Sequence, residues 1–323
     1  MADSPVLPAI PSDIAMVTGP ALIGVCLNWG LMGALIVQLY FYHLTFQDDH
    51  TALRVLVYGL FVLDVLQTVL VTADAFHWFV FGFGKLNMLD DTFFNSWDIP
   101  FLDAVIATIV QSFYCWRIWI FTKSKVFPML ICLVSLTQFG AGMATAIKAF
   151  QGGRLSLISV EEVAQQTTWL VASVVADIMI TAVMSYTLLR ERSMTLAARS
   201  TIDRIVRITV ETNMLTAGVA IVGLGLYLGF PEHPTLVVPP TAIMGKLYSN
   251  CLVAVLNNRR LPPGKSLTSH GSSADSHSFR PATDCQLTTE IQVDVLQTTD
   301  MDDEMLDEPK PSHPKHLSRS TRS

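Results

Sequence analysis

The amino-acid sequence predicts an all-α fold: a bundle of seven transmembrane helices with its N-terminus outside, its C-terminus cytoplasmic and a disordered C-terminal tail. Three observations support this prediction. Of the 323 residues, 51% are hydrophobic and only 15% are charged, and the mean hydropathy is positive. Seven apolar stretches are each long enough to cross the ~30 Å hydrocarbon layer of a bilayer. Lysine and arginine gather in alternate connections, as they do in multi-pass membrane proteins.

The elements follow one another closely along the chain. Residues 1–17 contain no lysine or arginine, so they lack the basic start of a cleavable signal peptide and are predicted to be a short extracellular tail. Charged residues, prolines and glycines then delimit seven predicted spans, at 18–42, 55–76, 101–121, 126–150, 167–189, 208–230 and 237–256. The last span is the weakest because it contains Pro239, Pro240 and Lys246, so six spans are the main alternative. Residues 257–323 are rich in Ser, Thr, Pro and acidic residues, a composition typical of a disordered cytoplasmic tail.

The orientation follows from the positions of the cationic residues. One set of connections contains Arg54, Lys123, Lys125, Arg190, Arg192, Arg199, Arg204, Arg259, Arg260 and Lys265, and the other contains Lys85, Lys148 and Arg154. The positive-inside rule makes the first set cytoplasmic. The two ends of the chain then lie on opposite sides of the membrane, which requires an odd number of spans. The plasma membrane is the expected location, with an internal membrane as the alternative.

The long outer connection, 77–100, is unusually apolar. Its aromatic residues suit a lid over the bundle or a short helix in the membrane interface. The alternative is an ordinary loop that packs on the bundle.

Composition and motifs argue against several functions. The net charge of −6 gives no basic face for nucleic acid. No cysteine pair is placed to form an extracellular disulfide. Of the eight histidines only His77 lies near a span, and Asp74 adds one further ligand at most, whereas a catalytic zinc needs three. The sequence therefore predicts no enzyme, no cofactor and no metal site.

Four polar residues share one depth near the middle of the predicted bundle. At 1.5 Å per residue, Asp64, Gln111, Asp177 and Lys246 lie roughly 14 to 18 Å from the cytoplasmic ends of their helices. An unpaired cation in hydrocarbon is costly, so Lys246 is expected to pair with Asp64, Asp177 or both. This layer is either a buried ion pair that fixes helix packing or the floor of a pocket that binds a ligand or an ion.

A second pair of charges lies nearer the cytoplasmic side. Arg117 and Glu211 are each about one turn inside their predicted helices, at matching depth. If the third and sixth helices adjoin, the pair would form a latch of the kind that a switch or gate requires. Alternatively, Arg117 extends toward the lipid headgroups beside Trp116 and Trp119.

The C-terminal half of the predicted bundle resembles a known family. Residues 200–217 (STIDRIVRITVETNMLTA) and 245–260 (GKLYSNCLVAVLNNRR) are similar to basidiomycete fungal multi-pass membrane proteins that carry a C-terminal domain of unknown function. The resemblance extends weakly over residues 15–260, and KLYSN is its most specific part. Asp177 fits the family's fifth-helix aspartate, and the residues that match the late-helix motif are Lys246, Tyr248, Ser249, Asn250, Asn257 and Arg259. The resemblance implies a seven-helix membrane protein, without an activity.

Receptor-like sensing is the function that the sequence favours. Seven spans, a basic inner connection at 190–207 and a Ser/Thr-rich tail all suit a receptor, with the lipid bilayer around it and a cytosolic signalling partner at 190–207. A small-solute or ion transporter or channel is the alternative that the midplane charges favour. A structural membrane scaffold is the third hypothesis. The sequence does not identify a ligand.

Overall fold

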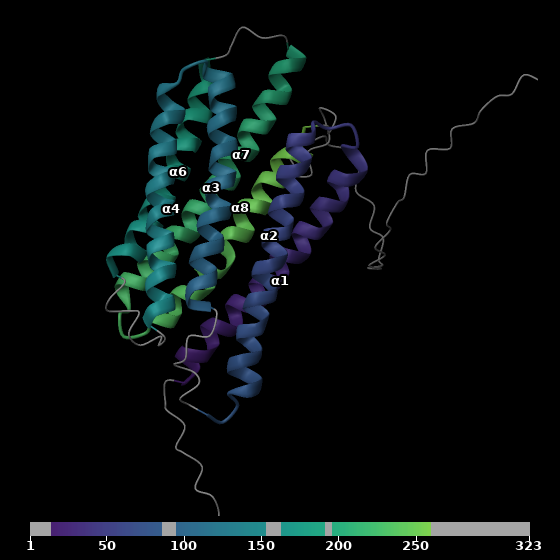
Figure 1. Ribbon diagram of the computed structural model, residues 1–323. Coiled ribbons are helices and arrows are strands. Elements are labelled where there is room, and N and C mark those ends of the chain that lie inside the picture. Colours follow the sequence, from purple (N-terminus) through teal and green to yellow (C-terminus); the bar gives the residue numbers. More distant parts are fainter. Residues whose placement is uncertain (1–13, 86–94, 153–162, 191–195, 260–323) are drawn as a thin grey trace, which may run out of the picture. The chain divides into compact units, whose positions relative to one another are not determined.

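The computed structural model describes residues 14–85, 95–152, 163–190 and 196–259, and these residues are almost entirely helical (Figure 1). The elements are α1 (Ile14–Thr45), α2 (Thr51–Phe76), the π-helical turn η1 (His77–Phe81), α3 (Asn95–Thr122), α4 (Val126–Gly152), α6 (Val163–Arg190), α7 (Leu196–Gly229), the 3-10 helix η3 (Pro234–Val237) and α8 (Val238–Asn257). All of them fall in one compact unit, Met1–Thr268. The predictions for residues 1–13 and 260–323, which include most of the two tails, lie outside the described residues.

Six of the described helices are long and apolar enough to cross a membrane. They are Ile14–Thr45, Thr51–Phe81, Trp97–Thr122, Val126–Gly152, Val163–Thr187 and Arg204–Gly229. Large apolar side chains such as Ile36, Val62 and Leu133 are exposed on their outer surfaces, where a soluble protein would place polar groups. The chain is therefore a multi-pass integral membrane protein.

Helix α8 has 20 residues but is not among these six, because Lys246, the two prolines and several polar residues make it less apolar. Its environment is mostly protein. From Met244 to Val253 every residue is buried, and α8 contacts α1, α2, α3 and α7. In Figure 1 it runs between the α1–α2 pair and helices α3 and α7. A helix that is shielded from lipid can carry polar residues, provided that neighbouring helices supply their partners. Pro239 and Pro240 do not break α8, because they occupy its first turn, where no backbone N–H is needed.

The remaining helices pack largely in chain order. Contacts join α1 to α2, α2 to α3, α3 to α4, α4 to α6 and α6 to α7, and α8 completes the bundle by packing along α1. The approach of α4 to α3 is close at Gly142, where an added Cβ would lie 2.8 Å from the Cβ of Ala104. Small residues at such crossings are typical of helix packing in membranes.

Five helices begin earlier than the sequence predicts: α1, α2 and α6 by four residues each, and α3 and α7 by more. Helix α3 starts at Asn95 rather than at 101, since Asp98 favours the positive end of a helix and Pro100 is tolerated near it. Helix α7 starts at Leu196 rather than at 208, so most of the predicted 190–207 connection is helical. In the outer connection, residues 77–81 continue α2 as a π-helical turn, and residues 86–94 lie outside the described part of the chain.

Candidate functional site: the polar interior around α8

The most deeply buried charge pair joins α8 to α2. The Nζ atom of Lys246 lies 3.2 Å from Oδ1 of Asp64, and both side chains are 0% exposed. Lys246 also donates a hydrogen bond to the backbone carbonyl of Asp64. Of the two carboxylates that the sequence offers as partners for Lys246, the structure places Asp64 against it.

Asp177 lies on another side of α8, at the junction of α6, α7 and α8. Its Oδ2 atom accepts hydrogen bonds from Thr216 Oγ1 at 2.5 Å and from the Tyr248 hydroxyl at 3.1 Å. Lys246 and Tyr248 are two positions apart, about 200° around a helix, so they point to opposite sides of α8. The predicted midplane layer is therefore divided between two sides of one central helix.

Gln111 has a separate partner within the same interior. Its Nε2 atom donates to Oε1 of Gln138 at 2.7 Å, which joins α3 to α4. Both residues are 1% exposed. The structure does not connect Gln111 by a hydrogen bond to Lys246, Asp64 or Asp177, so this part of the layer fixes the α3–α4 contact.

A third buried carboxylate, Asp103 of α3, escapes the sequence analysis. Its Oδ1 atom accepts hydrogen bonds from Gln67 Nε2 at 2.7 Å and from the backbone N–H of Gly245 at 3.0 Å. With a helix start at 101, Asp103 would belong to a helix end, but with the start at Asn95 it lies well inside α3. The signal that could have found it is Asp98, which suits the first turn of a helix that begins before Pro100.

The residues of the family motif bind several neighbouring segments. Asn250 Nδ2 donates to the carbonyl of Leu31 at 3.2 Å, and its Oδ1 accepts from Gln38 at 3.2 Å. Asn257 Nδ2 donates to the carbonyl of Gln38 at 2.9 Å. Ser249 is completely buried. The motif thus tethers α8 to α1, while Lys246 and Tyr248 tether it to α2 and α6.

The last motif residue, Arg259, forms an ion pair with the connection between α1 and α2. Its Nη2 atom lies 2.5 Å from Oδ2 of Asp49, and its guanidinium carbon lies 4.7 Å from the centre of the Phe46 ring. The hydroxyl of Tyr42 donates to the same Asp49 oxygen at 2.8 Å. Burial raises the pKa of Asp49, but the hydrogen bonds from Arg259 and Tyr42 and the charge of Arg259 outweigh it, so the pKa is lowered. We call these four residues the Arg259 clamp.

The clamp gives a pH-dependent contribution to stability. Because the pKa of Asp49 is lower in the folded protein than its ordinary value of 3.8, the stabilisation is complete above that value and is lost as pH falls through the folded-state pKa. We expect Asp49→Asn to lower the free energy of unfolding by about 1 to 3 kcal/mol at neutral pH. Detergent-solubilised protein unfolded by denaturant at neutral and acidic pH provides the measurement.

The exposed neighbour Asp48 supplies the matched control. Asp48→Asn should leave stability nearly unchanged at neutral pH, and the deficit of Asp49→Asn should disappear in acid. A deficit of equal size at both pH values would show that the charge of Asp49 is not what stabilises the clamp.

The predicted latch between Arg117 and Glu211 is not formed in the structure. Glu211 is exposed and accepts a hydrogen bond at 2.9 Å from Arg207, one turn earlier on α7. The guanidinium of Arg117 lies 5.5 Å from the centre of the Phe121 ring, one turn later on α3. Equal depth places two residues at one level of a bundle, but it does not place them on facing sides.

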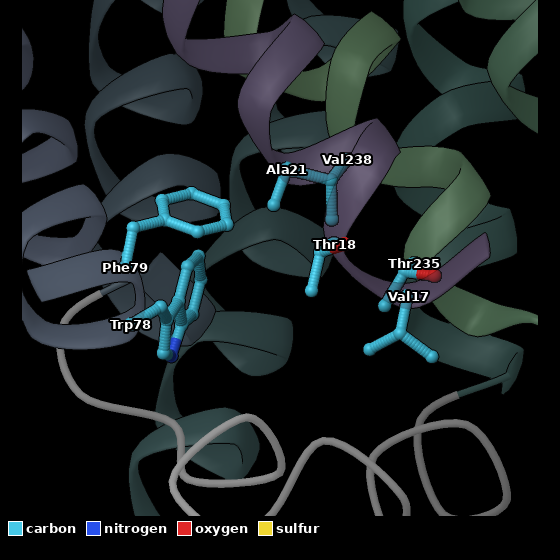
Figure 2. Close-up of a pocket in the computed structure, with 7 residues that line it drawn as sticks. All are labelled: Val17, Thr18, Ala21, Trp78, Phe79, Thr235 and Val238. Carbon is cyan, nitrogen blue, oxygen red and sulfur yellow. The ribbon is translucent and has the colours of Figure 1, made fainter. Parts of the chain in front are cut away.

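A small hollow lies at the opposite end of α8 from the clamp. Its volume is about 20 Å³, and it is lined by Val17, Thr18, Ala21, Trp78, Phe79, Thr235 and Val238. Figure 2 shows the rings of Trp78 and Phe79 on one side of the hollow and Val17 and Thr235 on the other. The hollow is roughly the size of one water molecule. Its apolar lining suits a small apolar group rather than an ion.

The described residues contain no group of three or more His, Cys, Asp or Glu side chains that could hold a metal ion. What the described interior does offer is a set of hydrogen-bond acceptors that are not used. Asp103 and Asp177 each keep one carboxylate oxygen without a hydrogen bond from the described residues. Such oxygens can accept a proton or a hydrogen-bond donor.

Many of the polar residues described above lie in a segment that other proteins share. Residues 173–261 match a family of unknown function (DUF6534). The match runs from α6 to the end of α8 and contains Asp177, Thr216, Lys246 and Arg259. No curated protein and no solved structure matches the chain. The match confirms the C-terminal domain of unknown function, while a fungal origin and a seven-helix family stay predictions.

Proposed function

We propose that this membrane protein is a receptor-like sensor in which α8 transmits a signal between the two ends of the bundle. The observation that supports this function is the position of α8. One end borders the hollow at Val238, the middle binds α2, α3 and α6 through buried polar groups, and the other end enters the Arg259 clamp. A displacement of α8 would break several buried hydrogen bonds together, which is how a packed element switches between two states.

The proposal includes seven spans. Helix α8 has 20 residues, enough to cover about 30 Å at 1.5 Å per residue. Its polar residues bind neighbouring helices instead of facing lipid. With the N-terminus outside, Arg54, Lys125 and Arg259 lie on the cytoplasmic side, in accord with the positive-inside rule.

This topology predicts the reactivity of cysteines toward a membrane-impermeant maleimide. We expect Glu232→Cys, in the exposed turn after α7, to react in intact cells. Lys125→Cys, before α4, and the native Cys285 of the C-terminal tail should react only after the membrane is permeabilised. The measurement is the labelled fraction before and after permeabilisation.

Wild-type protein, which has Cys26 exposed on α1, supplies the background for this labelling. Reaction of Lys125→Cys in intact cells, with Glu232→Cys protected, would reverse the orientation. Reaction of Cys285 from the same side as Glu232→Cys would show that α8 does not cross the membrane.

The sensing function predicts that a small apolar ligand enters the hollow and moves α8. The test is a thermal-stability screen of the purified chain against small apolar molecules, with Val238→Trp to fill the hollow and Val62→Trp as the matched control. Val62 is 63% exposed on α2 and does not line the hollow. A ligand that stabilises wild type and Val62→Trp but not Val238→Trp supports the proposal. A ligand that stabilises all three proteins equally counts against the proposal. So does a screen in which no molecule stabilises any of the three.

Signalling further requires a cytosolic partner, and the basic 190–207 segment at the start of α7 is the proposed surface. The partner should bind only when the ligand is present. Binding that is equally strong with and without ligand would contradict a sensor.

Ion or solute transport is the second candidate, because the described interior has more carboxylates than cations. The buried carboxylates of the described residues are Asp64, Asp74, Asp98, Asp103 and Asp177, whereas Lys246 is the one buried lysine among these residues. Intramembrane carboxylates of this kind occur in proton and ion pathways. Flux into liposomes that stops with Asp177→Asn and persists with Asp48→Asn would favour transport. Absence of both ligand response and flux would leave a structural scaffold. We do not propose an enzymatic function.

A further inference from the structure

Arg117 is a cation without a partner in the described part of the chain. It lies on α3, five residues before the helix ends at Thr122, and its side chain is partly buried. Its guanidinium contacts the Phe121 ring, and within the described residues it forms no hydrogen bond or ion pair. A guanidinium has five N–H donors and stays charged in proteins, so a partly buried one without an acceptor is costly.

Among the residues whose side chains the structure describes, the other arginines near this end of the bundle already have acceptors or are well exposed. Arg259 binds Asp49, and Arg207 binds Glu211. Arg54 is exposed at the start of α2. An anion at Arg117 would supply the missing acceptor.

The surroundings of Arg117 indicate which anion would reach it. Trp116 and Trp119 flank it in sequence, and their side chains are 49% and 48% exposed. Exposed tryptophans near the end of a spanning helix lie at the level of the lipid headgroups. The Phe121 ring packs against one face of the guanidinium. The N–H groups at the edge of the guanidinium stay available to a ligand. A guanidinium edge matches two oxygens of one phosphate group.

We propose that Arg117 forms a phosphate-binding site at the clamp end of the bundle, occupied by the phosphomonoester headgroup of an anionic lipid. A soluble phosphate ester has the same chemistry and is the alternative source. The site is independent of the sensing function, because it requires neither the hollow nor a movement of α8.

The test uses the full chain reconstituted in phosphatidylcholine nanodiscs. Phosphatidic acid is titrated into these nanodiscs, and retained lipid is measured by native mass spectrometry. Inorganic phosphate is tested separately as a competitor. We expect Arg117→Gln to bind phosphatidic acid about tenfold more weakly than wild type. Arg54→Gln removes an exposed arginine near the same end of the bundle and should bind as wild type does.

Each result has a defined meaning. Competition by inorganic phosphate would show that the site accepts soluble phosphate, and its absence would show that the lipid is the ligand. Equal affinities of wild type, Arg117→Gln and Arg54→Gln would overturn the proposal. If Arg117→Gln does not fold, Arg117→Lys is decisive, because a lysine keeps the charge but lacks the two-pronged geometry. Undiminished binding by Arg117→Lys would then overturn the proposed site.

Discussion

Lys246→Met is expected to destabilise the protein by about 3 to 5 kcal/mol, because it removes one partner of a fully buried ion pair and leaves the other uncompensated. The carboxylate of Asp64 would remain 0% exposed between α2 and α8 without its cation. The measurement is the free energy of unfolding in mixed detergent micelles. Lys125→Met, which removes an exposed lysine before α4, should have little effect.

A double substitution distinguishes the interaction between the two side chains from the separate contribution of each charge. Asp64→Leu combined with Lys246→Met removes both charges and replaces them with apolar groups of similar size. Such replacements are often neutral or stabilising, so the double variant should regain most of the stability that Lys246→Met loses. If the double variant is as unstable as the sum of its two single variants, the two side chains do not interact in the folded protein.

Gly245→Ala is expected to lower the free energy of unfolding by about 1 to 3 kcal/mol, the usual cost of overpacking a closely packed interior. A Cβ at this position would overlap Oδ1 of Asp103 and would lie 3.3 Å from Cδ1 of Ile106. Helix α8 would have to move away from α3, and the hydrogen bond from the Gly245 N–H to Asp103 would weaken.

Gly218→Ala on α7 is the matched control for this substitution. No atom lies within 4 Å of the Cβ that it would add, and the position is exposed. Alanine has the higher helix propensity, so Gly218→Ala should stabilise the protein by about 0.5 to 1 kcal/mol. Opposite signs for the two variants are the expected result. Stabilisation by both would show that α3 and α8 are not closely packed at Gly245.

The sequence predicts most of the helical architecture, because apolar length and the placement of charges are one-dimensional properties. Depth along a helix is also a one-dimensional property, and for this reason the sequence predicts Asp64 as a candidate partner of Lys246. The direction in which a side chain points from its helix, and which helix it meets, depend on packing. For that reason Asp177 binds Tyr248 instead of Lys246, and Glu211 binds Arg207 instead of Arg117.

Helix α8 shows the limit of hydropathy as a guide. Its prolines and lysine make it the weakest predicted span, yet its residues from Met244 to Val253 are all buried. Hydropathy measures how well a segment tolerates lipid, and α8 is covered by other helices. Asp103 is missed for a related reason, because Asp98 and Pro100 predict a helix boundary whereas α3 begins before both of them.

The enclosure of α8 has a consequence for biogenesis. A helix with a central lysine partitions poorly from the translocon into lipid by itself. Helix α8 follows α1, α2, α3 and α7 in the chain, and these helices supply its contacts. In the proposed seven-span arrangement, we therefore expect α8 to integrate only after these helices have assembled, so that its insertion completes the bundle.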